Sequence, residues 1–490
     1  MSMAHLLESG LIVDGSGGPS WVGDVLLLDG RIALIGENLA QRLPAGVSLG
    51  DVKRLDCTDK VIAPGFIDVH THDDAFVLRE PQCLPKVSQG VTTVVVGNCG
   101  ISLAPLVVDE PEPPLNLLGQ QDTFRYPSFE AYGRAVEQIR PAVNVAALVG
   151  HTTLRFAAMP QLDRAATVDE VERMAGLLDE ALSFGAFGLS SGLFYEPANA
   201  APSEEVLALA RVVARHGGVY TSHLRDEMAA ILEAMVEASD TALEAGVPLV
   251  ISHHKCAGPA NWGRSLQTLA FVDALSQRQP IALDAYPYLA GSTVLREDLV
   301  DGIIDVLVTW STPHPQMSGR MLADIAEEWR VDLQEACRRL QPGGACYFQM
   351  QEDDVERILS HRLTMVGSDG LPHDSHPHPR LWGAFPRVLA HHWRERGNFS
   401  LETAVHKMTG LSAGQFRLAQ RGLLKAGFHA DVVVFDPQRV QDTATYDKPV
   451  SPARGIEKVF VNGVLTYQEG HARIEQRAGH MLRRRGSSTT

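Results

Sequence analysis

The segment "GFIDVHTHDD" (residues 65–74) begins with apolar and β-branched residues, which predict a buried strand that ends near His72. Side chains at positions i and i+2 of a strand project to the same face, so we expect His70 and His72 to lie side by side. A His-x-His pair alone more often belongs to a half-exposed strand than to a metal site. The residues at the ends of the other strands therefore decide between these two interpretations.

Strand-like and helix-like segments alternate from about residue 63 to about residue 411. Apolar strands that alternate with amphipathic helices predict a parallel sheet buried on both faces. Eight such strands predict an α/β fold, a TIM-like (β/α)8 barrel of the metallo-hydrolase type. After the opening strand, the predicted strands lie in "VTTVVVGNCG", "VNVAALVGHTT", "AFGLSSGLF", "GVYTSHLRDE", "VPLVISHHK", "IALDAYPY" and "LTMVGSDG".

Both ends of the chain contain short β-like runs that are joined by tight turns. "DG" at Asp29–Gly30 and "NG" at Asn462–Gly463 are typical of β-hairpins. We expect the two ends to form one small β-sandwich domain. About seventy residues separate "DAYPY" from "LTMVGSDG", a length typical of a lid or a substrate-binding insertion. The predicted boundaries are 1–62 and 415–480 for the sandwich, 63–414 for the catalytic barrel with a lid insertion at about 290–350, and 481–490 for a disordered tail.

The composition excludes several classes of function. A formal net charge of −16 argues against nonspecific binding to nucleic acid, because phosphates call for concentrated lysine and arginine. The first residues lack a basic region before an apolar run, and no stretch has the apolar length of a membrane span, so we expect a cytoplasmic protein that does not bind membranes. Six cysteines without framework spacing predict reduced thiols. The sequence leaves open whether the chain forms an oligomer.

Metal-ligating and acid–base residues collect at the predicted strand ends, where barrel enzymes build their active sites. Imidazole, thiolate and carboxylate together suit Zn²⁺. Taken alone, Cys99 is typical of a buried structural thiol and Asp369 of a helix N-cap. Because ligand-type residues converge at the strand ends, we interpret Cys99 as a metal ligand and Asp369 as a general base. A carboxylate beside a metal can take a proton from water whose pKa the metal lowers towards about 7. The residues at these ends are His70, His72, Cys99, His151, His223, His253, His254 and Asp369.

Together these features resemble the amidohydrolase superfamily. The motifs "VVVGNCGIS", "GHTTLR", "GLSSGLFY", "SHLRDE", "ISHHK", "NWGRS" and "GSDGLPHDSHPHPRLWGAFPR" further resemble the D-aminoacylases, the N-acyl-D-amino-acid deacylases, over nearly the whole chain. The superfamily often bridges two metals with a carboxylated lysine after the fourth strand. "VNVAALVGHTT" and "AFGLSSGLF" contain no lysine. The resemblance implies that Cys99 takes its place.

The resemblance implies one tight zinc site and one weaker site. The tight site would use Cys99, His223 and His253. The weaker site would use His70, His72, Cys99 and Asp369. His254 adjoins His253, and neighbours in a strand point to opposite faces, so we expect only His253 to be a ligand.

The resemblance also implies the reaction. Zinc would polarise the carbonyl of an N-acyl-D-amino acid, while Asp369 takes the proton of the attacking water and returns it to the leaving amine. The products are a carboxylic acid and a free D-amino acid. The residues expected to bind the substrate are Lys255, Tyr195 and Arg380, with Ser292 as an extra donor; His151 would either support the site or face the oxyanion.

The favoured substrate depends on Arg296, which follows Ser292 by four residues. A cation there suits an acidic side chain, so we expect N-acyl-D-glutamate, with D-aspartate second. The alternative is that Arg296 pairs with Glu297 or Asp298, and the enzyme then prefers hydrophobic N-acyl-D-amino acids. A cyclic-amide hydrolase of the dihydropyrimidinase or hydantoinase type would need the missing lysine. A non-catalytic scaffold would have lost ligands that this chain retains.

Overall fold

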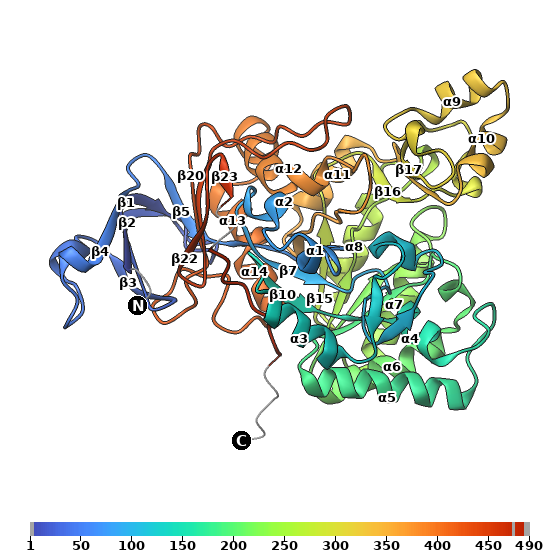
Figure 1. The fold of residues 1–490 in the computed structure, drawn as a ribbon, viewed down its shortest axis with the longest axis horizontal. Helices are drawn as coiled ribbons and strands as arrows, with labels where there is room; N and C mark the ends of the chain where they lie inside the picture. Colours follow the sequence, from blue (N-terminus) through green and yellow to red (C-terminus); the bar gives the residue numbers. More distant parts are fainter. Residues whose placement is uncertain (1–3, 473–475, 485–490) are drawn as a thin grey trace.

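The computed structural model describes residues 4–472 and 476–484 (Figure 1). Parallel strands form at all eight predicted segments. One sheet pairs three strands in the order β10-β7-β6, and another pairs six in the order β11-β12-β13-β14-β15-β19. Only Leu148 separates β10 from β11, and a parallel bridge between Thr71 and Gly370 connects the first segment to the last. The strands are β6 (Phe66–Asp68), β7 (Val91–Val96), β10 (Asn144–Ala147), β11 (Val149–Gly150), β12 (Gly188–Gly192), β13 (Val219–His223), β14 (Leu249–Ile251), β15 (Ile281–Ala285) and β19 (Thr364–Val366).

The first of these strands ends earlier than the sequence predicts. β6 stops at Asp68 and not near His72. The Asp68 carboxylate accepts hydrogen bonds from the backbone N–H groups of His70 (3.4 Å) and Ser368 (2.8 Å). These bonds engage backbone groups that would otherwise be available to continue the ladder. His70 and His72 still lie side by side, with their ring centroids 5.7 Å apart.

Helices follow the strands and cover them on the outside, as the lower right of Figure 1 shows for α5 and α6. Their ends are well specified. α5 starts with a capping box between Thr167 and Glu170 and ends at Gly185, whose φ is +118°. Within the described residues, no helix combines the length and apolar character needed to cross a membrane. The helices used below are α3 (Phe129–Ile139), α4 (His151–Ala158), α5 (Val168–Phe184), α6 (Ser203–His216), α7 (Ile231–Ala245), α11 (Glu352–Ser360), α12 (Arg380–Arg387) and α13 (Leu401–Met408).

The two ends of the chain meet in one nine-stranded sheet, which lies at one end of the molecule in Figure 1. β5 pairs antiparallel with β20, which joins the amino-terminal strands to the carboxyl-terminal ones. Apolar side chains from both ends pack in one core, among them Leu7, Ile32, Val432 and Phe460. The strands are β1 (Ala4–Ile12), β2 (Trp21–Leu28), β3 (Arg31–Gly36), β4 (Val52–Asp56), β5 (Val61–Pro64), β20 (Val432–Phe435), β21 (Ile456–Val461), β22 (Val464–Gln468) and β23 (His471–Ala472).

Both predicted hairpins are confirmed. Asp29 and Gly30 connect β2 to β3 with φ values of +49° and +75°, and Asn462 and Gly463 connect β21 to β22 with +48° and +81°. Positive φ at both central residues is the geometry of a type I′ turn, which favours Asn-Gly and Asp-Gly. A Cβ atom added at Gly463 would lie 2.8 Å from the Cα of Gly30, so the two turns pack closely against each other.

The long segment between β15 and β19 forms a small unit of its own, with its two helices at the upper right of Figure 1. Its three strands pair antiparallel in the order β16-β18-β17. Two helices pack on them, and apolar residues such as Val308, Ile325, Leu340 and Tyr347 form its core. The elements are β16 (Gly291–Val294), β17 (Val306–Ser311), α9 (Leu322–Trp329), α10 (Leu333–Leu340) and β18 (Gly343–Tyr347).

The predicted disordered tail is wrong for residues 481–484. Met481 is 4% exposed and forms a parallel bridge with Val145. The N–H of Leu482 donates to the Val145 carbonyl, and the N–H of Arg484 donates to the Gly185 carbonyl. Apolar contact and backbone bonding therefore hold this segment despite its charge. Residues 485–490 lie outside the described part of the chain.

Candidate metal centre

Six candidate ligands lie at or just beyond the carboxyl ends of parallel strands. His223 is the last residue of β13, and His253 follows β14 by two residues. Cys99 and Asp369 follow β7 and β19 by three residues each. Since these ends share one edge of the sheets, side chains distant in sequence meet there.

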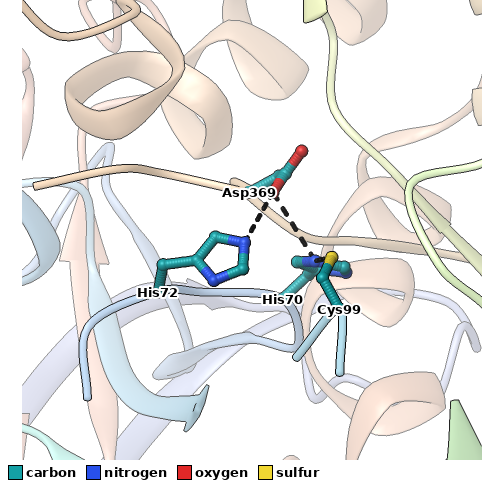
Figure 2. Close-up of side chains that lie close together, drawn as sticks. All are labelled: His70, His72, Cys99 and Asp369. Carbon is teal, nitrogen blue, oxygen red and sulfur yellow. Dashed lines mark hydrogen bonds and ion pairs between the residues drawn. The ribbon is translucent and has the colours of Figure 1, made fainter. Parts of the chain in front are cut away.

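His70, His72, Cys99 and Asp369 form the first group of donor atoms (Figure 2). His72 Nε2 lies 3.2 Å and His70 Nε2 3.5 Å from Asp369 Oδ1. His70 Nε2 is also 3.1 Å from Cys99 Sγ. All four residues are buried, and one ligand atom from each lies within 4.8 Å of the others. The atoms thus surround a space of the size that one cation fills.

Cys99, His223 and His253 form the second group. His253 Nε2 lies 2.8 Å from His223 Nδ1 and 3.3 Å from Cys99 Sγ. One thiol therefore belongs to both groups. A set of one sulfur and two imidazole nitrogens, with nitrogen and carboxylate oxygen in the adjacent group, matches the donors that Zn²⁺ prefers.

The electrostatics favour the ligand forms of Cys99 and Asp369. Burial alone would raise the pKa of the Cys99 thiol, but positive charge at His70 and His253 outweighs it and holds the pKa well below its usual value. Burial would also raise the pKa of Asp369, and Arg380 and His253 reverse that effect. Both shifts favour the anionic forms, which a metal ligand and a proton acceptor need.

Three of the candidate ligands have left-handed backbone conformations. The φ values are +53° at Cys99, +34° at His253 and +50° at Asp369. Non-glycine residues pay on the order of 1–3 kcal/mol for such geometry and keep it where surrounding contacts enforce it. Cys99 and His253 lie in turns, and Asp369 lies in the irregular segment that follows β19, so the backbone in all three places departs from the strand direction.

Two carboxylates that contact the candidate ligands were not predicted from the sequence. Asp284, near the end of β15, lies 3.1 Å from His70 Nδ1 and accepts the backbone N–H of His253 at 2.8 Å. Glu227, in the turn after β13, contacts His253 and Lys255. Asp284 stands near a strand end in "IALDAYPY", so the rule that found the ligands could have found it. Glu227 lies in the "SHLRDE" motif, but nothing in the sequence indicates which side chains it meets.

A buried lysine connects β6 and the segment after it, which carries His70, to the segment that carries Asp369. Lys86 is fully buried, and its Nζ lies 2.9 Å from Asp68, 3.3 Å from Asp73 and 3.0 Å from the Ser368 hydroxyl. Ser368 directly precedes Asp369 in the chain. The ammonium group thus neutralises two carboxylates and fixes the spacing of the two segments.

Replacing Lys86 by Met should destabilise the fold by about 3–5 kcal/mol, because two buried carboxylates lose their cation. The measurement is the free energy of unfolding in urea. Lys407→Met is the matched control, since buried Lys407 donates to the backbone carbonyls of His361 and Thr364 and not to carboxylates. Equal stability of Lys86→Met and the wild type would contradict this account.

One cavity is lined in part by the donor groups, and a second cavity shares a lining residue with it. The inner cavity, of about 40 Å³, is lined by Tyr195, Lys255, Ser292 and Asp369, all predicted site residues, together with Phe194, Tyr286 and Tyr347. The outer cavity, of about 1100 Å³, shares Tyr195 with the inner one and is lined by residues of the inserted unit, including Arg296.

Two further predicted residues, Arg380 and Arg296, each pair with a carboxylate of the protein. Arg380 is fully buried and is absent from the inner-cavity lining; its Nη1 pairs with Asp369 at 3.0 Å. Arg296 pairs with Asp298 at 2.7 Å, and its guanidinium lies 4.4 Å from the centre of the Phe194 ring. Asp369 thus engages the charge of Arg380, and the predicted contact of Arg380 with a substrate carboxylate stays a prediction.

His151 and His254 bond to residues outside the two donor groups. His151 Nε2 lies 2.9 Å from Glu205, which also pairs with Arg155, and His151 lines neither cavity. Glu205 in α6 holds the His151 ring in a separate buried cluster, so the expected role of His151, which is either to support the site or to face the oxyanion, stays a prediction. His254 Nε2 is bonded to Thr268 at 2.8 Å, so the structure places His253 and not His254 among the donors.

Comparison with known proteins gives consistent results. Residues 53–303 and 318–467 match the model of the amidohydrolase family. A D-aminoacylase of Alcaligenes xylosoxydans xylosoxydans is 49% identical over 482 residues, which cover 98% of this chain and 97% of that protein. An N-acyl-D-aspartate deacylase of the same organism is 47% identical over 478 residues, covering 97% and 94%. The crystal structure of an N-acyl-D-glutamate deacylase of Bordetella bronchiseptica, complexed with zinc and a phosphonate inhibitor, is 46% identical, with a TM-score of 0.92 and coverage of 99% and 100%.

Proposed function

This chain belongs to the amidohydrolase family, among its D-aminoacylases, and from that membership we propose that it hydrolyses N-acyl-D-amino acids to a carboxylate and a free D-amino acid with zinc as cofactor. The observation that carries the proposal is the shared Cys99 thiol, which joins two donor groups beside a cavity lined by Lys255 and Tyr195. The test is release of free amino acid by the zinc-loaded protein from N-acetyl-D-glutamate, N-acetyl-D-aspartate, N-acetyl-D-leucine and N-acetyl-L-glutamate. Inactivity on all four would overturn the proposal.

The two donor groups would hold zinc unequally. Cys99, His223 and His253 would form the tight site, and His70, His72, Cys99 and Asp369 the weaker one. When bound, zinc supplies a Lewis acid for the amide carbonyl and lowers the pKa of water.

The side chains of this protein then transfer the proton and bind the substrate. The Asp369 carboxylate accepts the proton of the attacking water and returns it to the leaving amine. Lys255, in the inner-cavity lining, offers a point charge to the α-carboxylate of the substrate, and Tyr195 and Ser292 offer hydroxyl groups. Arg380, which pairs with Asp369, would complete this set.

Arg296 supports N-acyl-D-glutamate as the favoured substrate. Its guanidinium lies over the Phe194 ring, which stacks on His223 with a centroid distance of 5.4 Å. The cation is therefore separated from a candidate zinc ligand by one aromatic ring. The pairing with Asp298 supports the alternative, an enzyme for hydrophobic N-acyl-D-amino acids. The relatives with different substrate names are almost equally identical to this chain, so overall identity does not choose between these alternatives.

Replacing Arg296 by Met should lower kcat/KM for N-acetyl-D-glutamate by about 10- to 150-fold, the equivalent of a charged hydrogen bond worth about 1.5–3 kcal/mol. Hydrolysis of N-acetyl-D-leucine should change little, because its side chain carries no charge. Arg338→Met serves as control, since Arg338 pairs with Glu297 and Glu335 and lines neither cavity. An equal loss for both substrates would assign Arg296 a structural role.

Membership of the amidohydrolase family is also consistent with the predicted architecture, and the sequence argues against the cyclic-amide alternative. The parallel pairing and the Thr71–Gly370 bridge support one closed (β/α)8 barrel at 63–414, with the insertion at about 290–350. The nine-stranded sheet supports a β-sandwich from 1–62 and 415–480. Cyclic-amide hydrolysis has no observation in its favour here, because no lysine stands in "VNVAALVGHTT" or "AFGLSSGLF".

A further inference from the structure

Glu227 faces the outward nitrogens of two candidate zinc ligands. His253 and His223 present Nε2 and Nδ1 to the second donor group. Their other nitrogens face the same carboxylate: His253 Nδ1 lies 3.0 Å from Glu227 Oε1, and His223 Nε2 lies 3.8 Å from Glu227 Oε2. One buried side chain is therefore placed to serve both imidazoles.

The outer nitrogen of His223 lacks another hydrogen-bond partner in its described surroundings. His223 Nε2 is buried and lacks a hydrogen-bond partner within the described part of the chain. When Nδ1 of an imidazole binds a metal, Nε2 carries the proton, and a buried N–H without an acceptor costs about 1–3 kcal/mol. Glu227 Oε2, at 3.8 Å, is the carboxylate oxygen that faces this nitrogen.

Glu227 also holds Lys255. Lys255 Nζ lies 2.7 Å from Glu227 Oε1 and 2.8 Å from His253 Nδ1. The backbone reinforces this contact, because the N–H of Ala257 donates to the Glu227 carbonyl at 2.8 Å. The loop that carries His253 and Lys255 is thus tied to the turn that carries Glu227.

We propose that Glu227 is a positioning residue that sets the ring orientation and tautomer of both His223 and His253 while it anchors Lys255. A carboxylate that accepts the outer N–H of a ligating histidine fixes the ring and raises the basicity of the nitrogen that binds the metal. Glu227 does this for two ligands at once. The roles of the zinc ligands and of Lys255 rest on the proposed function; the three contacts do not.

The test compares the zinc affinity of purified variants by competition with a chromogenic chelator in the absence of substrate. Glu227→Gln keeps the size of the side chain and removes its charge, and it should weaken zinc binding by about 10- to 100-fold. Glu227→Asp restores the charge at a shorter reach and should recover part of that loss. The visible spectrum of the cobalt-substituted protein should also change in Glu227→Gln, because the ligand geometry relaxes.

The matched control is Glu205→Gln, which removes the charge of another buried carboxylate that accepts from a histidine, His151, outside both cavities. It should keep wild-type zinc affinity. Wild-type affinity and cobalt spectrum in Glu227→Gln would overturn the proposal. If Glu227→Gln does not fold, Glu227→Asp decides, and wild-type affinity in that variant would overturn it equally. Because these assays contain no substrate, an enzyme inactive on every N-acyl-D-amino acid would refute the proposed function and leave this result standing.

Discussion

Replacing Asp369 by Asn is expected to lower kcat for the best N-acyl-D-amino acid by about 10²- to 10⁴-fold, the usual contribution of a general acid–base group. Asparagine keeps the size of the side chain but cannot take a proton from water. It also leaves the Arg380 guanidinium, now 3.0 Å from the carboxylate, without its anion. The measurement is kcat at saturating substrate, together with the zinc content of the purified variant.

Zinc at Cys99, His223 and His253 should survive this substitution, because Asp369 is not in that donor group. Asp354→Asn provides the control: Asp354 is a buried carboxylate in α11 that pairs with Arg357 at 3.1 Å and lines neither cavity. Its kcat should match the wild type. A kcat for Asp369→Asn within tenfold of the wild-type value would show that Asp369 does not transfer the proton.

Replacing Cys99 by Ala should remove zinc from both donor groups. Structural zinc sites bind with about 10–16 kcal/mol, so one ligand among three or four carries on the order of 3 kcal/mol, or about 100-fold in affinity. The variant should lose zinc on dialysis, and its turnover should fall to that of metal-free protein. Atomic absorption and the release of free amino acid measure the two effects.

His72→Ala separates the two donor groups, because His72 belongs to the first group alone. That variant should keep the tightly bound zinc. Cys337→Ala controls for loss of a buried thiol, since Cys337 lies in α10, in the core of the inserted unit. Retention of full zinc content by Cys99→Ala would exclude the shared-thiol arrangement.

Features that depend on neighbours in the sequence were the most predictable. Asp29–Gly30 and Asn462–Gly463 are turns whose geometry the two residues themselves impose. The candidate ligands could be found because a parallel sheet brings all carboxyl strand ends to one edge. The end of β6 was misplaced, since it depends on Asp68 bonding to Ser368, which is remote in sequence.

Long-range contacts account for the features that sequence could not predict. Lys86 has the sequence character of a surface residue, and only the fold shows that Asp68 and Asp73 surround it. Charge at Arg483 and Arg484 suggests a solvated tail, yet Met481 finds an apolar partner segment at Val145. Only the resemblance implies a substrate contact for Arg380, and its pairing with Asp369 depends on the fold, because the two residues stand on different segments of the site.

The pairing of β5 with β20 has a consequence for how the chain is synthesised. Pro64 pairs with Val432, so β5 leaves the ribosome long before its partner strand exists. At ~5–20 residues per second the delay is about 20–70 s. During that time the amino-terminal strands expose an unpaired sheet edge, the kind of surface that joins another chain. Newly made molecules are therefore open to pairing with another chain at this edge until the last strands emerge.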